Sequence, residues 1–445
     1  NGYRYFRLSK WYVDQYMEGV DWEKLSEAAS WIEGNLCASV TEENGTEYSR
    51  NLLKAPRPRN DIIASFIDDI KLNDDIPIDE MEKVHGPGSF FYKDDTTTTV
   101  CFDHELQHMM KYTNGHRASS QTLLESYNKS NLDIVTNTRV LFIIFEENKA
   151  TGVVVMHNDE RRVIKLHQDG EIVIGAGTFM SPVILQNSGI GPIWMSQRFN
   201  RKVRYANADV GKNFWSPVYP SWVVGFERIH VHEGPMDDTI RTRDLFVTSV
   251  RENGHCIRID WRIDKEEETY LVYAESVELM TPISNGNEGR VETRGDTENP
   301  DVYHHYFNNE NEYIYLLCDA LELLFKRIML PLYEKGIYNK LESPMSWITG
   351  LPDLKEKVES DTSYSWKTNV ELFNKIRENI TRYDSIHNGG TCSMHKVVDK
   401  NLKVYGTSNV RVSDLSIFPK PLIGNPVGAS FQIGRYVGTL IADGK

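Results

Sequence analysis

One stretch of the chain constrains its fold more than any other, because it predicts a strand, a glycine turn and a helix in immediate succession. Residues 171–174 end in three β-branched side chains and predict a strand, which the turn at residues 175–177 follows. Ser181 suits the N-cap of the next helix, Pro182 its first position and Gly189 the residue past its end. Since glycines let a backbone approach a ligand closely, this unit predicts a cofactor-binding strand–turn–helix.

The segments around this unit predict two kinds of sheet. Further strands are expected at residues 132–136, 140–145 and 152–156. Residues 162–167 and 171–174 predict a hairpin about Asp169 and Gly170. Residues 221–280 alternate apolar and polar side chains over several runs, which is typical of an antiparallel sheet with one solvated face. The expected fold class is therefore mixed α/β and α+β.

Helices and one irregular segment complete the expected organisation. Residues 21–36 predict a helix capped by its first residue, and residues 312–328 predict a strongly apolar one. Asn425 and Pro426 open a last helix. Residues 44–115 are polar and irregular, which indicates a peripheral excursion. Because the end of the chain returns to the texture of its first part, the middle is interpreted as an insert.

Charge and cysteine usage exclude several classes of function. The 445 residues carry a net charge of −14, so no basic excess is present to neutralise nucleic-acid phosphates. The longest apolar runs, such as residues 140–145, are far too short for a transmembrane segment. The five cysteines are widely spaced without a CxxC pair, which disfavours zinc and dithiol sites. Glycosylation triplets at Asn44, Asn128 and Asn379 permit a secretory or extracellular location without establishing one.

A histidine near the end of the chain is the best candidate for a general base. His387 precedes Gly389 and Gly390, and a histidine on a glycine-flanked loop can take a proton near neutral pH. Asn425 would place its amide beside the positive end of the last helix, where an oxyanion is stabilised. The simpler interpretations are one structural histidine among 13 and a plain N-cap. Cys392 is interpreted as structural, because no base stands at a diagnostic spacing.

These segments resemble the glucose–methanol–choline (GMC) oxidoreductases, a flavoprotein family, over essentially the whole chain. Residues 177–191 look like a complete match to the family's second signature, and residues 387–394 are similar to its active-site histidine loop. Residues 410–419 are similar to its flavin-contacting segment. Residues 424–426 and 433–438 look most like the plant branch, which includes mandelonitrile lyases and Hothead-like proteins.

The resemblance implies an FAD-binding Rossmann-like domain and a substrate domain with a mainly antiparallel sheet covered by helices. Residues 1–215 and 376–445 would form the FAD-binding domain, and residues 216–375 the substrate-binding domain. Family members begin with a GxGxxG strand–turn–helix, which this sequence lacks, and Asn1-Gly2 look like the pair that follows the family's first glycine-serine motif. Three explanations stay open: a fragment, a separate N-terminal FAD-binding polypeptide, or a relative that has lost its flavin.

The resemblance also implies roles for individual residues, with FAD as the cofactor. His387 would be the catalytic base, and Asn425 its partner on the substrate oxygen. The residues expected to contact FAD are Asn1, Gly2, Val140, Gly177, Asp414, Asn425, Pro426 and Val427. No metal site is expected.

Three functions compete. The first is FAD-dependent oxidation of an alcohol, in which His387 takes the hydroxyl proton while hydride passes from the carbinol carbon to flavin N5. The second is a hydroxynitrile lyase whose FAD does no redox work. The plant lyases carry a histidine where this chain has Asn425, which favours oxidation. The third is a structural or assembly role on a fold that has lost FAD, and the retained pair argues against it. The expected substrate is a small apolar or aromatic alcohol.

Overall fold

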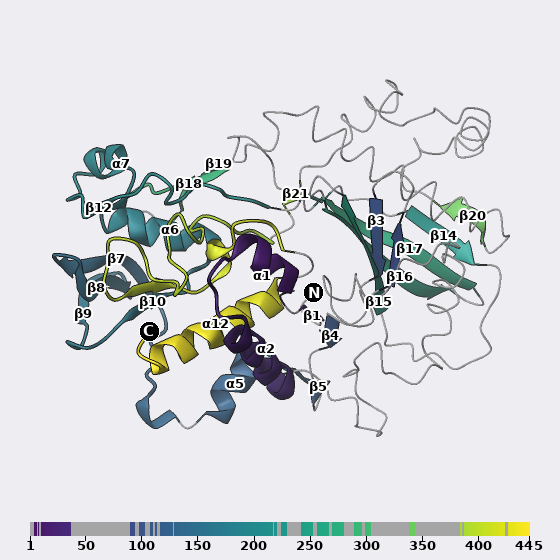
Figure 1. Ribbon diagram of the computed structural model, residues 1–445, viewed down its shortest axis with the longest axis horizontal. Coiled ribbons are helices and arrows are strands. Elements are labelled where there is room, and N and C mark those ends of the chain that lie inside the picture. Colours follow the sequence, from purple (N-terminus) through teal and green to yellow (C-terminus); the bar gives the residue numbers. More distant parts are fainter. Residues whose placement is uncertain are drawn as a thin grey trace.

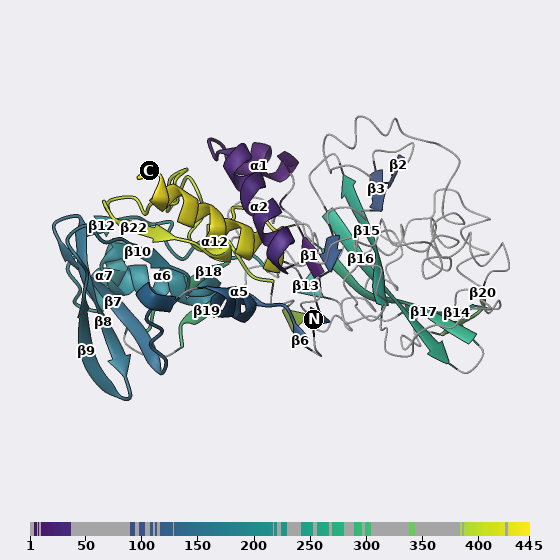
Figure 2. The same ribbon diagram turned by 90° about the horizontal axis from the view of Figure 1, so that it is seen from below.

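The computed structural model places two groups of strands at opposite ends of the molecule (Figures 1 and 2). The helices lie beside the group that contains residues 138–165 (Figures 1 and 2). The structure describes residues 4–6, 8, 10–36, 90–93, 98–102, 107–109, 112–113, 116–127, 129–216, 218–219, 224–228, 242–251, 256–266, 269–279, 289–295, 299–303, 338–342, 383–384, 387–422 and 426–445. The predicted helix at 312–328 lies outside these residues, as do the asparagines of the three glycosylation triplets and Asn1, Gly2 and Asn425.

One end of the molecule is a nine-stranded sheet whose pairs are antiparallel (Figure 1). Its strands are β2 (Phe90–Lys93), β3 (Thr98–Phe102), β13 (Val218–Tyr219), β14 (Val224–Arg228), β15 (Thr242–Arg251), β16 (Cys256–Glu266), β17 (Thr269–Leu279), β20 (Tyr338–Glu342) and β21 (Tyr383–Asp384). The prediction of an antiparallel sheet in residues 221–280 is confirmed. The prediction of irregular structure throughout residues 44–115 is wrong, because β2 and β3 join this sheet through β15. Their aromatic and β-branched residues favour strands despite the polar surroundings.

The other end holds a smaller antiparallel sheet of β7 (Thr138–Glu146), β8 (Lys149–His157) and β9 (Glu160–Lys165). These strands agree with three of the predicted ones. The strand predicted at residues 132–136 is wrong: the segment forms no ladder, and Ile134 and Val135 are exposed. Strand propensity alone does not make a strand where no neighbour offers hydrogen bonds.

The predicted hairpin about Asp169-Gly170 is also wrong. β9 pairs with β8, whereas β10 (Ile172–Ile174) pairs in parallel with β22 (Val410–Val412). Gly170 does turn the chain, donating its N–H to His167 O at 2.9 Å, but the next strand finds a distant partner. A fully buried arginine secures this pair: Arg411 Nε donates to Glu171 Oε2 at 2.6 Å.

The remaining strands form short two-stranded pairs. They are β1 (Arg4–Phe6) with β4 (Gln107–Met109), β5 (Tyr112–Thr113) with β6 (His116–Arg117), β11 (Ile190–Gly191) with β12 (Tyr205–Ala206), and β18 (Arg290–Glu292) with β19 (Asp301–Tyr303). The shorter helices are α1 (Lys10–Tyr16), α5 (Ser120–Ser126) and α7 (Ile193–Arg198), with the 3-10 turns η2 (Lys129–Asn131) and η4 (Leu415–Ile417).

Helix α6 (Gly177–Asn187) runs through the core and contacts β7, β11, β18 and η4. It begins five residues earlier than predicted, so Ser181 is not its N-cap and Pro182 is not its first residue. Pro182 lies sixth, inside the helix, where it has no N–H to offer the carbonyl four residues back. Residues 181–190 are all buried, which explains why this helix has apolar side chains on every side.

Helices α2 (Trp22–Leu36) and α12 (Val427–Ala442) lie side by side (Figures 1 and 2). The predicted cap is confirmed, since Lys24 N donates to Asp21 Oδ1 at 3.2 Å. A buried glutamine joins the helices: Gln432 Nε2 donates to Leu25 O, and its Oε1 accepts Leu8 N. In the described part of the chain, none of the helices combines the length and apolar character that crossing a membrane requires.

Candidate functional site

The parallel pair β10–β22 places two chain segments side by side at the carboxyl ends of its strands. Ile172 pairs with Val410 and Ile174 with Val412, and Ser413 N donates to Ile174 O at 2.8 Å. The glycine turn after β10 therefore lies beside the turn after β22. Ligands of α/β folds bind at such strand ends, so this edge is the first place to look for a site.

Asp414 joins the two turns through three hydrogen bonds. Its Oδ2 accepts the N–H of Gly177 at 2.9 Å and the hydroxyl of Ser181 at 2.5 Å, while its Oδ1 accepts Ser416 N at 2.8 Å. The carboxylate is buried, so these donors replace water. Asp414 thereby caps η4 and fixes the first turn of α6 at once.

The turn itself leaves backbone open to a ligand. Gly177 has φ +80, a left-handed conformation that favours glycine, and a Cβ added to it would meet no atom within 4 Å. Gly175 and Ala176 are exposed. The first turn of α6 thus presents peptide groups at the strand ends, where a cofactor can approach them.

The His387 loop is bound to this same turn by two threonines. Thr178 Oγ1 donates to Asn388 O, and Thr391 Oγ1 donates to Thr178 O, each at 2.6 Å. Pro182 makes the second bond available, because an ordinary residue there would donate its own N–H to the carbonyl of Thr178. We call this reciprocal pair the threonine latch.

Two glycines let the loop pass close to its other neighbours. Gly389 pairs with Trp215 through N–H···O bonds of 2.9 and 3.1 Å, and a Cβ on Gly389 would lie 2.0 Å from the indole ring. Gly390 has φ +92, and its added Cβ would lie 2.0 Å from Asn213 O. A larger residue would displace the buried indole at Gly389 and the backbone at Gly390.

His387 itself is half-buried, while the residues after it are buried through Met394. Burial raises the pKa of the Cys392 thiol far above its ordinary value, with the Asp414 carboxylate as the second cause. The thiol therefore stays protonated, which supports the interpretation of Cys392 as structural. Among the described residues, no group of three or more histidine, cysteine, aspartate or glutamate side chains is arranged to hold a metal ion.

The other predicted contact residues are spread more widely. Val140 is half-buried on β7, which packs on the far end of α6: Asn187 Nδ2 donates to Leu141 O at 3.3 Å. Ten residues separate Gly177 from Asn187, about 15 Å along a helix. Pro426 is buried at the N-cap of α12, and the half-buried Val427 is its first helical residue.

Sequence reasoning thus placed His387, Gly177 and Asp414 in one neighbourhood, and the structure joins the His387 loop to both others. It missed the threonine latch and Trp215. Proline inside a helix was the available signal for the latch, because it leaves a carbonyl in need of another donor.

Comparisons with known proteins find relatives of a single family. Two family models described as GMC oxidoreductase match residues 92–216 and 285–434. Protein HOTHEAD of Arabidopsis thaliana is 24% identical over 74% of this chain and 60% of its own length. An oxygen-dependent choline dehydrogenase of Yersinia pseudotuberculosis is 26% identical over 74% and 59%. (R)-mandelonitrile lyase 3 of Prunus serotina is 24% identical over 74% and 56%.

Solved structures show the same fold. A fungal aryl-alcohol oxidase covers 100% of this chain with a TM-score of 0.61 at 12% identity, and this chain covers 84% of it. The chain spans 54% to 60% of the length of the first curated relatives it matches. The comparisons give no support for a separate FAD-binding polypeptide.

Proposed function

Because the chain belongs to the GMC oxidoreductase family, we propose that it takes part in the FAD-dependent oxidation of an alcohol, with His387 as the general base. FAD is the cofactor of this family, so the cofactor prediction is confirmed at the level of the family. The reaction and the roles of individual residues in this chain are our proposals.

One observation carries the proposal: the His387 loop is tied directly to the open glycine turn at the ends of two parallel strands. The latch bonds of Thr178 and Thr391 hold the loop, and Asp414 holds Gly177. The loop of the proposed base and a ligand-accessible backbone thereby belong to one framework. Such fixed geometry is what proton transfer in an active site needs.

The residues present fit FAD at this edge. Gly177 has open space where a side chain would stand, and Gly175 and Ala176 are exposed beside it. These residues and Asp414, with Pro426 and Val427, are proposed to hold the cofactor. When bound, FAD supplies the electron acceptor that no protein side chain provides.

His387 is proposed to remove the proton from the substrate hydroxyl. Asn425 is proposed to donate a hydrogen bond to the oxygen that loses this proton, which would stabilise the developing negative charge. Cys392 is excluded from this role, because its buried thiol stays protonated and would not accept the proton.

The test begins with FAD titration of the purified chain, followed by anaerobic mixing with benzyl alcohol. The expected result is saturable FAD binding and bleaching of the visible flavin band by the alcohol. Release of cyanide from mandelonitrile without any bleaching by alcohols would instead assign lyase chemistry. A chain that neither binds FAD nor turns over either compound would contradict both and leave the structural role.

Substitution then tests the base. His387→Ala should keep FAD binding and reduce bleaching by about 10²- to 10⁴-fold, the usual contribution of a general base. His395→Asn is the matched control, because His395 is exposed on the same segment and its φ of +65 is one that asparagine tolerates. Equal loss in both variants, or none in His387→Ala, would show that another group is the base.

A further inference from the structure

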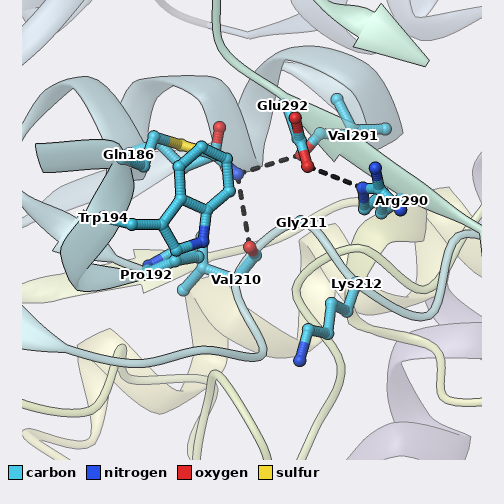
Figure 3. Close-up of a pocket in the computed structure, with 10 residues that line it drawn as sticks. Gln186, Pro192, Trp194, Val210, Gly211, Lys212, Arg290, Val291 and Glu292 are labelled. Carbon is cyan, nitrogen blue, oxygen red and sulfur yellow. Dashed lines mark hydrogen bonds and ion pairs between the residues drawn. The ribbon is translucent and has the colours of Figure 1, made fainter. Parts of the chain in front are cut away.

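A cavity of about 300 Å³ lies beside the C-terminal half of α6 (Figure 3). It opens between α6, the start of α7, strand β18 and residues 210–212. Gln186 contributes to its wall and follows Gly177 by nine residues, about 13 Å along the helix axis. The cavity is therefore separate from the strand ends where FAD is proposed to bind.

One wall is apolar and flat. Met195 and Val210 are buried residues of its lining, while Trp194 is 48% exposed and presents its indole there (Figure 3). The Gln186 side chain offers the ligand little polarity, because its amide N–H₂ already donates to Val210 O at 3.2 Å and Val291 O at 3.0 Å. An exposed indole over an apolar floor favours a planar ring stacked on it.

The opposite side carries charge. Arg290 Nε donates to Glu292 Oε1 at 2.6 Å, and the guanidinium also lies 4.1 Å from the Tyr303 ring centroid, so these two charges offset one another. Lys212 is exposed at the cavity, and no described carboxylate forms an ion pair with it. The lining is thus left with one net positive charge, which suits a single anionic group.

Size narrows the ligand further. Given that a water molecule occupies about 30 Å³ of the liquid and bonded atoms pack more tightly, 300 Å³ holds roughly ten to fifteen non-hydrogen atoms. We propose that this cavity is a second small-molecule site, which binds an aromatic carboxylate with its ring on Trp194 and its carboxylate at Lys212.

The position of the cavity also connects it to the His387 loop. Val291 N donates to Gly211 O at 2.7 Å, and Gly211 N donates to Thr391 O at 2.8 Å. Both Val291 and Gly211 line the cavity, so its wall and the latch share one hydrogen-bonded path. Binding of a ligand in this cavity is measured without any enzymatic turnover. The result therefore does not depend on whether the chain oxidises an alcohol.

Calorimetry of the purified full chain with 2-naphthoate tests the site, with 2-naphthamide as the neutral probe of the same size. We expect saturable binding of the carboxylate and at least about tenfold weaker binding of the amide, because a charge-assisted hydrogen bond is lost. Lys212→Met should weaken 2-naphthoate about tenfold and leave the amide unchanged. Trp194→Ala should weaken both probes about tenfold.

Matched controls separate the cavity from general effects. Lys202→Met removes an exposed lysine outside the lining, and Trp31→Ala removes an indole on α2 that is 40% exposed. Both should bind 2-naphthoate as the unmodified chain does. Absence of saturable binding, equal affinity for the two probes, or equal weakening by Lys212→Met and Lys202→Met would each overturn the proposal.

Discussion

Replacing Thr391 by valine is the most direct test of how the His387 loop is held. The side chain of Thr391 is fully buried, and its hydroxyl donates to the carbonyl of Thr178 at 2.6 Å. Valine keeps the shape of the side chain and removes only the donor. Thr178 is also buried, so water would not easily take the place of the lost hydroxyl.

The expected cost follows from the helix. A buried acceptor left without its donor costs about 1–3 kcal/mol. In most helices the N–H four residues on would compensate, but Pro182 stands there and has none. We therefore expect Thr391→Val to lower the free energy of unfolding by about 2 kcal/mol. Thr391→Ser, which keeps the hydroxyl, should cost less.

The same argument makes a sharper prediction about Pro182. Pro182→Ala restores an N–H that can donate to the carbonyl of Thr178. In that background Thr391→Val should cost about 1 kcal/mol less than in the unmodified chain. The double-mutant cycle thus measures whether the Thr391 hydroxyl and an N–H at position 182 compete for the same acceptor, the carbonyl of Thr178.

Urea unfolding followed by far-ultraviolet circular dichroism measures these free energies. Thr439→Val is the matched control, because its hydroxyl donates to Arg435 O at 3.2 Å on the exposed side of α12, where water can replace it. That variant should stay within about 0.5 kcal/mol of the unmodified chain. A cost for Thr391→Val no larger than the control, or equal costs in both Pro182 backgrounds, would refute the reasoning.

Three further predictions concern Asp414, Glu171 and Cys392. Asp414→Asn should lower the free energy of unfolding in urea by about 2–3 kcal/mol. The amide must turn its N–H₂ toward one of two N–H donors, that of Gly177 or that of Ser416, and so loses that hydrogen bond. An unchanged midpoint of urea unfolding would contradict this. The hydrogen bond from the buried arginine of β22 lowers the pKa of Glu171 in the folded chain. The carboxylate therefore stabilises the fold fully above its ordinary pKa of 4.5, and this stabilisation is lost as pH falls through the lowered pKa. Glu171→Gln should flatten the decline of Tm below pH 4.5, and parallel curves of Tm against pH for the two chains would contradict this. Burial raises the pKa of Cys392, so peptide mapping after iodoacetamide at pH 8 should find it labelled in urea but hardly in the native chain, whereas native labelling at the rate of a free thiol would show it accessible.

Much of the fold was predictable because its signals are local. Short apolar runs rich in β-branched residues identified strands β7 and β8, and alternating side chains identified the antiparallel sheet of residues 221–280. Asp21 identified the start of α2 because an N-cap bonds within its own first turn. Where a strand pairs with a distant segment, local signals fail. The turn at Gly170 was correct, but no local pattern says that Ile172 pairs with Val410 instead of folding back.

The same distinction applies to the candidate site. His387 and Gly177 stand in recognisable motifs, so the sequence marked them as candidates. The two bonds of the latch each join residues that are more than 200 positions apart in the sequence. A threonine in either motif looks like any other small polar residue. Helix α12 holds a related case, because the polar Gln432 is buried where both ends of its amide find partners.

Pro182 suggests one role in the sequence and has another in the folded chain. As a local signal it suggested the start of a helix, where its missing N–H would cost nothing. Inside α6 the missing N–H leaves the Thr178 carbonyl without its helical partner, and Thr391 supplies one from the His387 loop. The proline therefore makes the helix depend on the loop for a hydrogen bond, and the loop depends on the helix for its position. On this argument the framework around His387 is set by folding before any ligand arrives, so changes at Thr391 should act first on stability and changes at His387 on chemistry.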